Sequence, residues 1–256
     1  KVLGFAPTID QAFGYGRGVH NLMRAIHLDA AYYAGLADDR ETLLGEAQGL
    51  IDEGLFYLRY TTGDPLENMK KRAAGIVADY VITYRDELGR LEFEPERAFE
   101  TLIEEAGVLV SGAIDVIRHD DPPRVALVDF KSGDPAKQNE NASGLDKELM
   151  KLQVSLYGLA AKTELEYEPD LGIVRYLGVP ADASPDEREI SVPLTGEALA
   201  EARQTIKAVA ADIQERNWRE GPRRPPKKPR NTSRCQECDF SLLCGRPGPA
   251  SEADRS

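Results

Sequence analysis

The stretch VALVDFKSG, residues 125–133, restricts the fold of this chain more than any other segment. Its apolar residues predict a buried β-strand that ends at a glycine turn. Asp129 and Lys131 interrupt the apolar run, and because alternate residues of a strand point to one face, their side chains are expected to lie together. A charged pair inside a core strand breaks the hydrophobic pattern, as is expected at functional sites. The alternative interpretation is a surface ion pair on an edge strand.

The pattern of the remaining chain predicts one α/β core with helices at its N-terminal end. Helical spacing predicts helices over residues 18–34, 40–53, 65–87, 145–163 and 196–218. Strand and turn signals predict strands over 91–103, 107–117, 125–133, 171–179 and 188–194, with turns at EEAG and HDDPPR. The 256 residues are 41% hydrophobic, which is enough to build a substantial core.

Asp115 adds a second carboxylate to the charged patch. The predicted turn HDDPPR makes the two strands that flank it antiparallel neighbours, so Asp115 can reach the side chains of Asp129 and Lys131. Two carboxylates and an ammonium group at one end of a sheet suit Mg²⁺ or Mn²⁺, which prefer oxygen ligands. Such an ion would join a phosphate oxygen to a water, and Lys131 would lower the pKa of that water or balance charge in the transition state.

Five motifs resemble those of one enzyme superfamily. GAID, followed about fourteen residues later by VDFKSG, resembles the core of the PD-(D/E)xK nuclease superfamily in its RecB-like branch (the AddB, RecB and CRISPR-associated type). FGYGRGVH resembles the G-x-x-x-H signature of that branch, LQVSLYGLA its Q-x-x-x-Y helix, and RCQECDFSLLCG the C-terminal cysteine segment of its iron–sulfur members. The resemblance implies a restriction-endonuclease-like core, a mixed central sheet flanked by helices, with a helical N-terminal insertion.

The resemblance also implies roles for the residues that match these motifs. Asp115 and Asp129 would bind the metal, His20 would ligate or support it, and Lys131 would position or activate the attacking water. His20 has an alternative interpretation as a helix cap or a core contact. Glu96 is compared with an acid that members of the family carry before the GxxD strand.

Gln153 and Tyr157 lie four residues apart and share one face of the predicted helix. The resemblance implies that they orient the catalytic lysine and the DNA backbone. They could instead fill the seam between helix and sheet, and the sequence leaves both interpretations open.

Three cysteines, Cys235, Cys238 and Cys244, lie within ten residues. They are open to interpretation as part of a zinc site, as structural thiols, or as three of the four ligands of a 4Fe–4S cluster. The resemblance implies a fourth cysteine before the G-x-x-x-H helix, and the sequence opens at Lys1, just after its expected place. We therefore expect the cluster in a longer parent protein. For this chain, a three-cysteine cluster with an exchangeable fourth ligand and a metal-free segment both stay open.

The net charge of −12 argues against general coating of nucleic acid, although residues 216–234 are strongly basic. This run is either a solvated linker or a segment that follows phosphates. No apolar run is long enough to span a membrane, and the odd, clustered cysteines favour a reducing, cytoplasmic location. The predicted organisation is a single RecB-like domain over 1–246 (helical 18–90, core 91–215, basic linker 216–234, cysteine segment 235–246) and a flexible tail over 247–256.

These observations predict a metal-dependent DNA nuclease, an exonuclease on single strands or unwound ends. The chain opens without Met and contains no GxxxxGK[ST] motif, so we interpret it as the nuclease domain at the C-terminus of a superfamily 1 (UvrD/Rep-like) helicase in DNA repair or recombination. The alternatives are a stand-alone CRISPR-associated nuclease, a non-catalytic module that binds DNA ends, and a metal- or redox-sensing domain whose working part is the cysteine segment.

Overall fold

The computed structural model describes residues 14–59, 61–121, 123–133 and 147–215. The basic run, the cysteine segment, the tail and most of the loop after the third strand lie outside these residues. The described elements are α1 (Tyr15–Leu28), α2 (Ala30–Gly35), α3 (Arg40–Asp52), α4 (Asp64–Thr83), α5 (Arg85–Arg90), β1 (Glu92–Ile103), the 3₁₀ turn η1 (Glu104–Ala106), β2 (Val108–Asp121), β3 (Arg124–Lys131), α6 (Lys147–Thr163), β4 (Glu168–Tyr176), α7 (Pro185–Arg188), β5 (Glu189–Pro193) and α8 (Gly196–Gln214).

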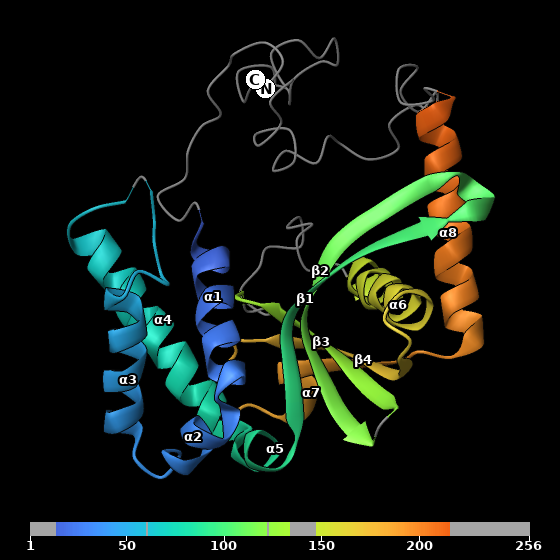
Figure 1. Ribbon diagram of the computed structural model, residues 1–256. Helices are drawn as coiled ribbons and strands as arrows, with labels where there is room; N and C mark the ends of the chain where they lie inside the picture. Colours follow the sequence, from blue (N-terminus) through green and yellow to red (C-terminus); the bar gives the residue numbers. More distant parts are fainter. Residues whose placement is uncertain (1–13, 60, 122, 134–146, 216–256) are drawn as a thin grey trace, which may run out of the picture.

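The five strands form one mixed sheet in the order β1-β2-β3-β4-β5 (Figure 1). β1, β2 and β3 form an antiparallel meander. β3 and β4 are parallel, and α6 provides the crossover between them, while β5 returns antiparallel to β4. This sheet, flanked by helices, confirms the predicted α/β fold class.

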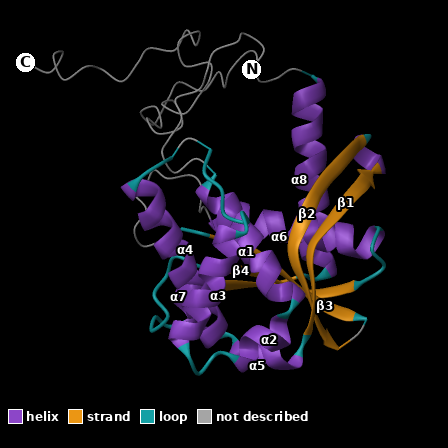
Figure 2. Ribbon diagram, turned by 60° about the vertical axis from the view of Figure 1, so that its left-hand side comes forward, coloured by secondary structure: helices purple, strands orange, loops and turns teal. Residues whose placement is uncertain are grey.

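Helices cover both faces of the sheet. α1, α3 and α4 gather on one side and α6 and α8 on the other, as the two views in Figures 1 and 2 show. The long β1–β2 hairpin runs beside α8, where Arg203 binds Glu105 at 2.9 Å and Gln214 donates to the carbonyl of Ala106. The central strand β3 is therefore covered on both faces, which explains its nearly continuous apolar sequence.

The apolar face predicted for the first helix is confirmed. Its residues Val19, Leu22, Met23 and Ile26 are fully buried. Gly18 allows this close approach, because a Cβ atom there would lie only 2.6 Å from the ring of Phe56. The packing of α1 thus holds the G-x-x-x-H segment against the rest of the fold.

Two predicted helices are divided in the structure. The helix predicted over 18–34 is interrupted at Asp29, whose φ of −135° is not helical, and the helix predicted over 65–87 is interrupted at Tyr84. The short helices after these breaks, α2 and α5, pack against each other, and a Cβ on Gly89 would lie 3.5 Å from that of Ala34. The spacing of apolar residues along the chain does not predict these breaks, because the contact between α2 and α5 joins segments that are far apart in the sequence.

Strand boundaries also differ from the prediction. The turn expected over 119–124 is tighter, since β2 continues to Asp121, which pairs with Arg124 at the start of β3. The fourth strand covers Glu168–Tyr176 instead of 171–179, because its first residue pairs with Arg124 on β3. Pairing with a neighbouring strand, which the local sequence does not reveal, extends β2 and shifts β4 by three residues toward the N-terminus.

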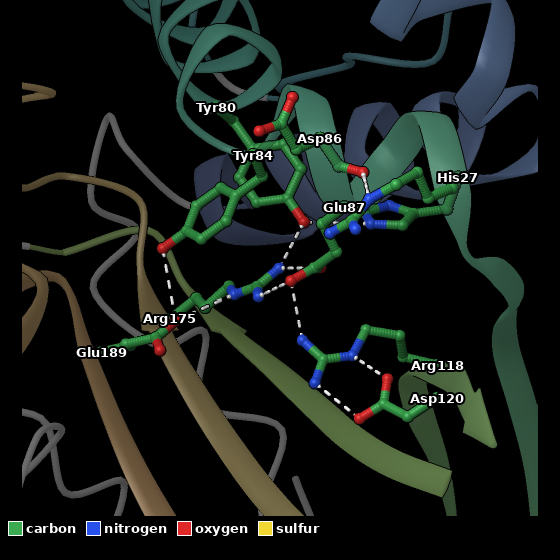
Figure 3. Close-up of polar contacts among 10 residues, drawn as sticks. His27, Tyr80, Tyr84, Asp86, Glu87, Arg118, Asp120, Arg175 and Glu189 are labelled. Carbon is green, nitrogen blue, oxygen red and sulfur yellow. Dashed lines mark hydrogen bonds and ion pairs between the residues drawn. The ribbon is translucent and has the colours of Figure 1, made fainter.

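A buried polar network joins the N-terminal helices to the sheet (Figure 3). Arg175 of β4, only 2% exposed, donates to the carboxylate of Glu87 on α5 at 2.8 and 2.7 Å. Arg118 of β2 donates to the same carboxylate at 2.7 Å. The guanidinium of Arg175 also lies 3.8 Å from the ring centre of Tyr84, a cation–π contact. A charge inside the apolar strand LGIVRYLGV is thus neutralised by a residue 88 positions earlier.

A hydrogen-bonded chain extends the network to α1. Arg175 donates to the hydroxyl of Tyr80 at 2.9 Å, and this hydroxyl lies 3.0 Å from Nε2 of His27. Nδ1 of His27 lies 2.7 Å from the carbonyl of Met23. These contacts are consistent with a neutral imidazole that donates from Nδ1 and accepts the Tyr80 hydroxyl at Nε2.

Acidification is expected to destabilise the protein through His27. Burial lowers the pKa of His27 to about 4, although its hydrogen bond to Met23 opposes the shift. Since an unfolded imidazole titrates near pH 6.5, the unfolded state binds the proton first, and stability is lost as the pH falls from about 6.5 to about 4. The complete loss is about 3 kcal/mol. Urea unfolding at several pH values measures this loss. If His27→Gln lost as much unfolding free energy between pH 6.5 and about pH 4 as the unaltered chain, His27 would not be the cause.

Candidate active site

The two predicted acids lie side by side on neighbouring strands. Val116 of β2 pairs with Val128 of β3 in antiparallel register, so Asp115 and Asp129 occupy the next positions of the two strands. The backbone N–H of Phe130 donates to Oδ2 of Asp115 at 2.8 Å and thereby orients this carboxylate. The predicted neighbourhood of the two strands is confirmed.

Asp129 and Lys131 point to the same side of β3. Nζ of Lys131 lies 2.7 Å from Oδ2 of Asp129, and this carboxylate is only 1% exposed. An ammonium and a carboxylate this close form a charge-assisted contact inside the protein. The pair therefore belongs to the interior of the sheet, which rules out the alternative of a surface pair on an edge strand.

Helix α6 supplies the side chains that hold this pair. Gln153 donates from Nε2 to Oδ1 of Asp129 at 2.8 Å and accepts from Nζ of Lys131 at 3.0 Å. The same Nε2 lies 2.8 Å from the hydroxyl of Tyr157, which donates to Oδ1 of Asp129 at 3.3 Å. The crossover helix thus packs a glutamine and a tyrosine, one turn apart, over the charged end of β3.

His20 approaches the two acids from α1. Its Nδ1 lies 3.2 Å from Oδ1 of Asp115, and its ring packs edge-on against Phe130. A cavity of about 280 Å³ opens beside this contact and is lined by both His20 and Asp115. The structure therefore brings together all six candidate residues of the sequence that lie among the described residues: His20, Asp115, Asp129, Lys131, Gln153 and Tyr157.

The close carboxylates shift the titration of the cluster. Burial raises the pKa of Asp129, and the negative charge of Asp115 raises it further against the opposing effect of Lys131. Burial alone would lower the pKa of His20, but the hydrogen bond and charge of Asp115 outweigh it, and the net pKa is raised. Burial also raises the pKa of Tyr157, with a further contribution from Asp129, so its hydroxyl keeps its proton near neutral pH. The raised pKa values of Asp129 and His20 mean that both side chains bind a proton more readily than they would in water.

The donor types of the cluster suit a hard divalent cation. The negative charge of Asp115 raises the pKa of the buried Asp129 carboxyl, and a divalent cation bound between the two acids would offset that repulsion. With the side chains as they stand, however, no three His, Cys, Asp or Glu residues in the described ranges converge as a metal site. His20 and Lys131 occupy carboxylate oxygens that an ion would need.

Glu96 lies in the same cavity wall. It sits on β1, where Pro95 pairs with Val116 and Arg97 with Ile114, so its place in the register is opposite Asp115. Its φ of 53° is left-handed, which is uncommon for a residue other than glycine. Its carboxylate binds Arg24 of α1 at 2.9 Å rather than any of the candidate residues.

The predicted cysteine ligands, Cys235, Cys238 and Cys244, lie outside the described residues. Two further features were missed by the sequence analysis. Arg175 interrupts an apolar strand just as Asp129 does, so the same signal could have indicated the buried network. Arg17, which lines the cavity beside His20, carries no comparable signal, since an arginine early in an amphipathic helix is ordinary. Along the described part of the chain, no helix combines the length and apolar character that crossing a bilayer requires.

Replacing Gln153 by Met is expected to lower catalytic activity about 10- to 100-fold, because residues that orient ligands and their partners typically contribute this much. The variant keeps the bulk of the side chain and removes its hydrogen bonds to Asp129 and Lys131. Gln48→Met is the matched control, since Gln48 makes a similar helical hydrogen bond to Asp52 away from the site. Steady-state kinetics over a range of Mn²⁺ concentrations measure the effect, and equal activity of the two variants would contradict it.

A comparison of the sequence with protein-family models identifies the family of the chain. A family model described as PD-(D/E)XK nuclease superfamily matches residues 2–245, nearly the whole chain. The chain therefore belongs to the PD-(D/E)XK nuclease superfamily. This finding confirms the family that the motifs predicted, whereas the RecB-like branch and the iron–sulfur character stay predictions.

The other comparisons add little to the family assignment. No curated protein sequence matches the chain. Among solved structures, SSO0001 shares 18% identity over 80% of both chains with a TM-score of 0.37. A "putative exonuclease" from Eubacterium rectale shares 15% identity over 98% of this chain and 81% of its own, with a TM-score of 0.43. Similarities of this size carry no argument about function.

Proposed function

We propose that this chain is a metal-dependent DNA nuclease whose active site is the cluster on β2, β3, α1 and α6. The observation that carries the proposal is the arrangement around Asp129, a buried carboxylate that contacts Lys131, Gln153 and Tyr157 and lies beside Asp115. Burying charged and polar side chains costs free energy of folding. A cluster that is kept despite this cost is expected to serve function rather than stability. Membership of a nuclease superfamily supports the same function.

Each residue of the cluster has a proposed part in phosphodiester hydrolysis. Asp115 and Asp129, with support from His20, would hold Mg²⁺ or Mn²⁺. When bound, such an ion would lower the pKa of a water and neutralise phosphate charge. Lys131 would orient the attacking water or stabilise the charge that develops on the phosphate oxygens. Gln153 and Tyr157 would keep the lysine and Asp129 in place through the hydrogen bonds described above.

The finer features of the proposal come from the motif resemblance. We propose exonuclease action on single strands or unwound ends, within a superfamily 1 helicase that acts in DNA repair or recombination, and a cytoplasmic location. The three C-terminal cysteines would bind a 4Fe–4S cluster in a longer parent protein that supplies a fourth ligand. For the chain itself, iron and sulfide analysis of anaerobically purified protein decides between a three-cysteine cluster and a metal-free segment.

A cleavage assay tests the proposed function. The chain is incubated with end-labelled single- and double-stranded DNA and with Mg²⁺ or Mn²⁺, with and without EDTA. We expect metal-dependent cutting that EDTA abolishes, and products shortened from one end. DNA binding that is insensitive to the chelator, without cutting, would favour a non-catalytic module that binds DNA ends. Binding of neither metal nor DNA would overturn the proposal.

A further inference from the structure

The cavity beside the cluster carries positive as well as negative side chains. α1 contributes Arg17, His20 and Arg24 to its lining, and the β1–β2 hairpin contributes Glu96 and Asp115. The cavity volume of about 280 Å³ leaves space for a substrate group next to the proposed catalytic residues. A nucleic acid that enters this cavity brings negative phosphates toward the carboxylates of Glu96 and Asp115, which repel them. A positively charged side chain in the cavity lining would offset this repulsion and help to position the strand.

Two arginines line the cavity, Arg17 and Arg24, and they differ in whether a neighbouring acid neutralises them. Arg24 is neutralised by Glu96, from which its Nε lies 2.9 Å. Arg17 is exposed, and no hydrogen bond or ion pair joins it to another residue among those that the structure describes. The first turn of α1, which contains Arg17, has no acidic residue. Its guanidinium group therefore keeps its full charge and all its donors for a ligand.

The helix places Arg17 on the side of the proposed active site. Residues three apart on a helix are neighbours on its surface, and Arg17 precedes by three residues His20, the residue that contacts Asp115. A group that Arg17 holds in the cavity therefore lies in the same space that His20 and Asp115 line.

From this geometry we infer that Arg17 binds a phosphate of the DNA strand next to the phosphate that is cleaved. An arginine presents a planar fork of donors that matches two phosphate oxygens, and such contacts set the position of a strand without reading its sequence. Arg17 is a substrate-binding residue in this account, and the cluster around Lys131 performs the chemistry. The inference rests on the proposed nuclease function and adds the residue that places the strand.

Arg17→Ala tests the inference against Arg97→Ala. Arg97 is also exposed, has the same charge and sits on β1 one residue after Glu96, but it does not line the cavity. For Arg17→Ala we expect KM for a single-stranded oligonucleotide to rise about 10-fold with kcat nearly unchanged, as for a contact made equally in ground and transition states. The slope of log affinity against log salt should fall by about 0.7, the value for one lost phosphate contact on a single strand.

A third variant separates the geometry of the contact from its charge. Arg17→Lys keeps the charge without the planar fork, so its KM should lie between those of the unaltered chain and Arg17→Ala. Equal KM values and salt slopes for Arg17→Ala and Arg97→Ala, in a chain that cuts DNA, would overturn the inference and leave the proposed function standing. Failure of the unaltered chain to cut or bind DNA would instead overturn the proposed function, and the inference with it.

Discussion

Replacing Lys131 by alanine is expected to lower kcat for DNA cleavage about 10²- to 10³-fold. The size follows from the proposed role, because removing one preorganised group that stabilises transition-state charge typically costs 10²- to 10³-fold. The variant also leaves Asp129 without the ammonium that lies 2.7 Å from its carboxylate. Since Lys131 lowers the pKa of Asp129, its removal raises that pKa further and favours the protonated acid, which binds a metal poorly.

The experiment compares single-turnover cleavage of labelled single-stranded DNA by the two proteins at several Mn²⁺ concentrations. Lys151→Ala is a suitable control, because Lys151 lies on α6 near the site but pairs with Glu148 on the exposed surface. Circular dichroism of each variant checks that the fold is retained. Cleavage by Lys131→Ala at the rate of the unaltered chain would exclude the cluster as the active site, even if the chain proves to be a nuclease.

Replacing Arg175 by methionine is expected to lower the free energy of unfolding by about 3–5 kcal/mol at neutral pH. The methionine fills much of the same space, but the carboxylate of Glu87 loses two of the three hydrogen bonds that arginines donate to it. A buried charge that loses its partner is more costly than a buried pair that is removed whole. The hydroxyl of Tyr80 loses a donor in the same change.

Urea denaturation of the purified variants measures this loss. Arg124→Met is the matched control, since the Arg124–Asp170 pair is well exposed and such pairs contribute at most about 1 kcal/mol. The double variant Arg175→Met/Glu87→Leu should recover part of the stability, because both charges are then absent. A loss for Arg175→Met no larger than that for Arg124→Met would show that the network adds little to stability.

The candidate site was predicted in large part from local sequence. Asp129 and Lys131 stand two apart in an apolar run, and a strand has a side-chain period of two, so their shared face follows from the sequence. Gln153 and Tyr157 stand four apart on a helix, and the same reasoning places them together. The proximity of Asp115 needed one further step, the antiparallel pairing across a short turn. These three predictions depend only on residues that lie close together in the sequence.

Long-range packing determined what the sequence did not predict. The breaks at Asp29 and Tyr84 accompany the contact between two short helices. The extra residues of β2 and the shifted bounds of β4 come from pairing with neighbouring strands. The left-handed backbone of Glu96 has no signal in its own segment, since its residue type is ordinary in a loop or a strand. Such features depend on which elements meet, and that information is spread over the whole chain.

The sequence by itself determined the superfamily, the mixed α/β fold class and the strand that carries an acid and a lysine, because periodicity and motif spacing are local properties. Only the tertiary structure decided that Arg175 is neutralised by Glu87, that Arg24 is occupied by Glu96, and that the charge of Arg17 is left available beside Asp115. The physical reason is that the energy of a charge depends on its burial and on its neighbours within a few ångströms, and both are set when distant segments pack together.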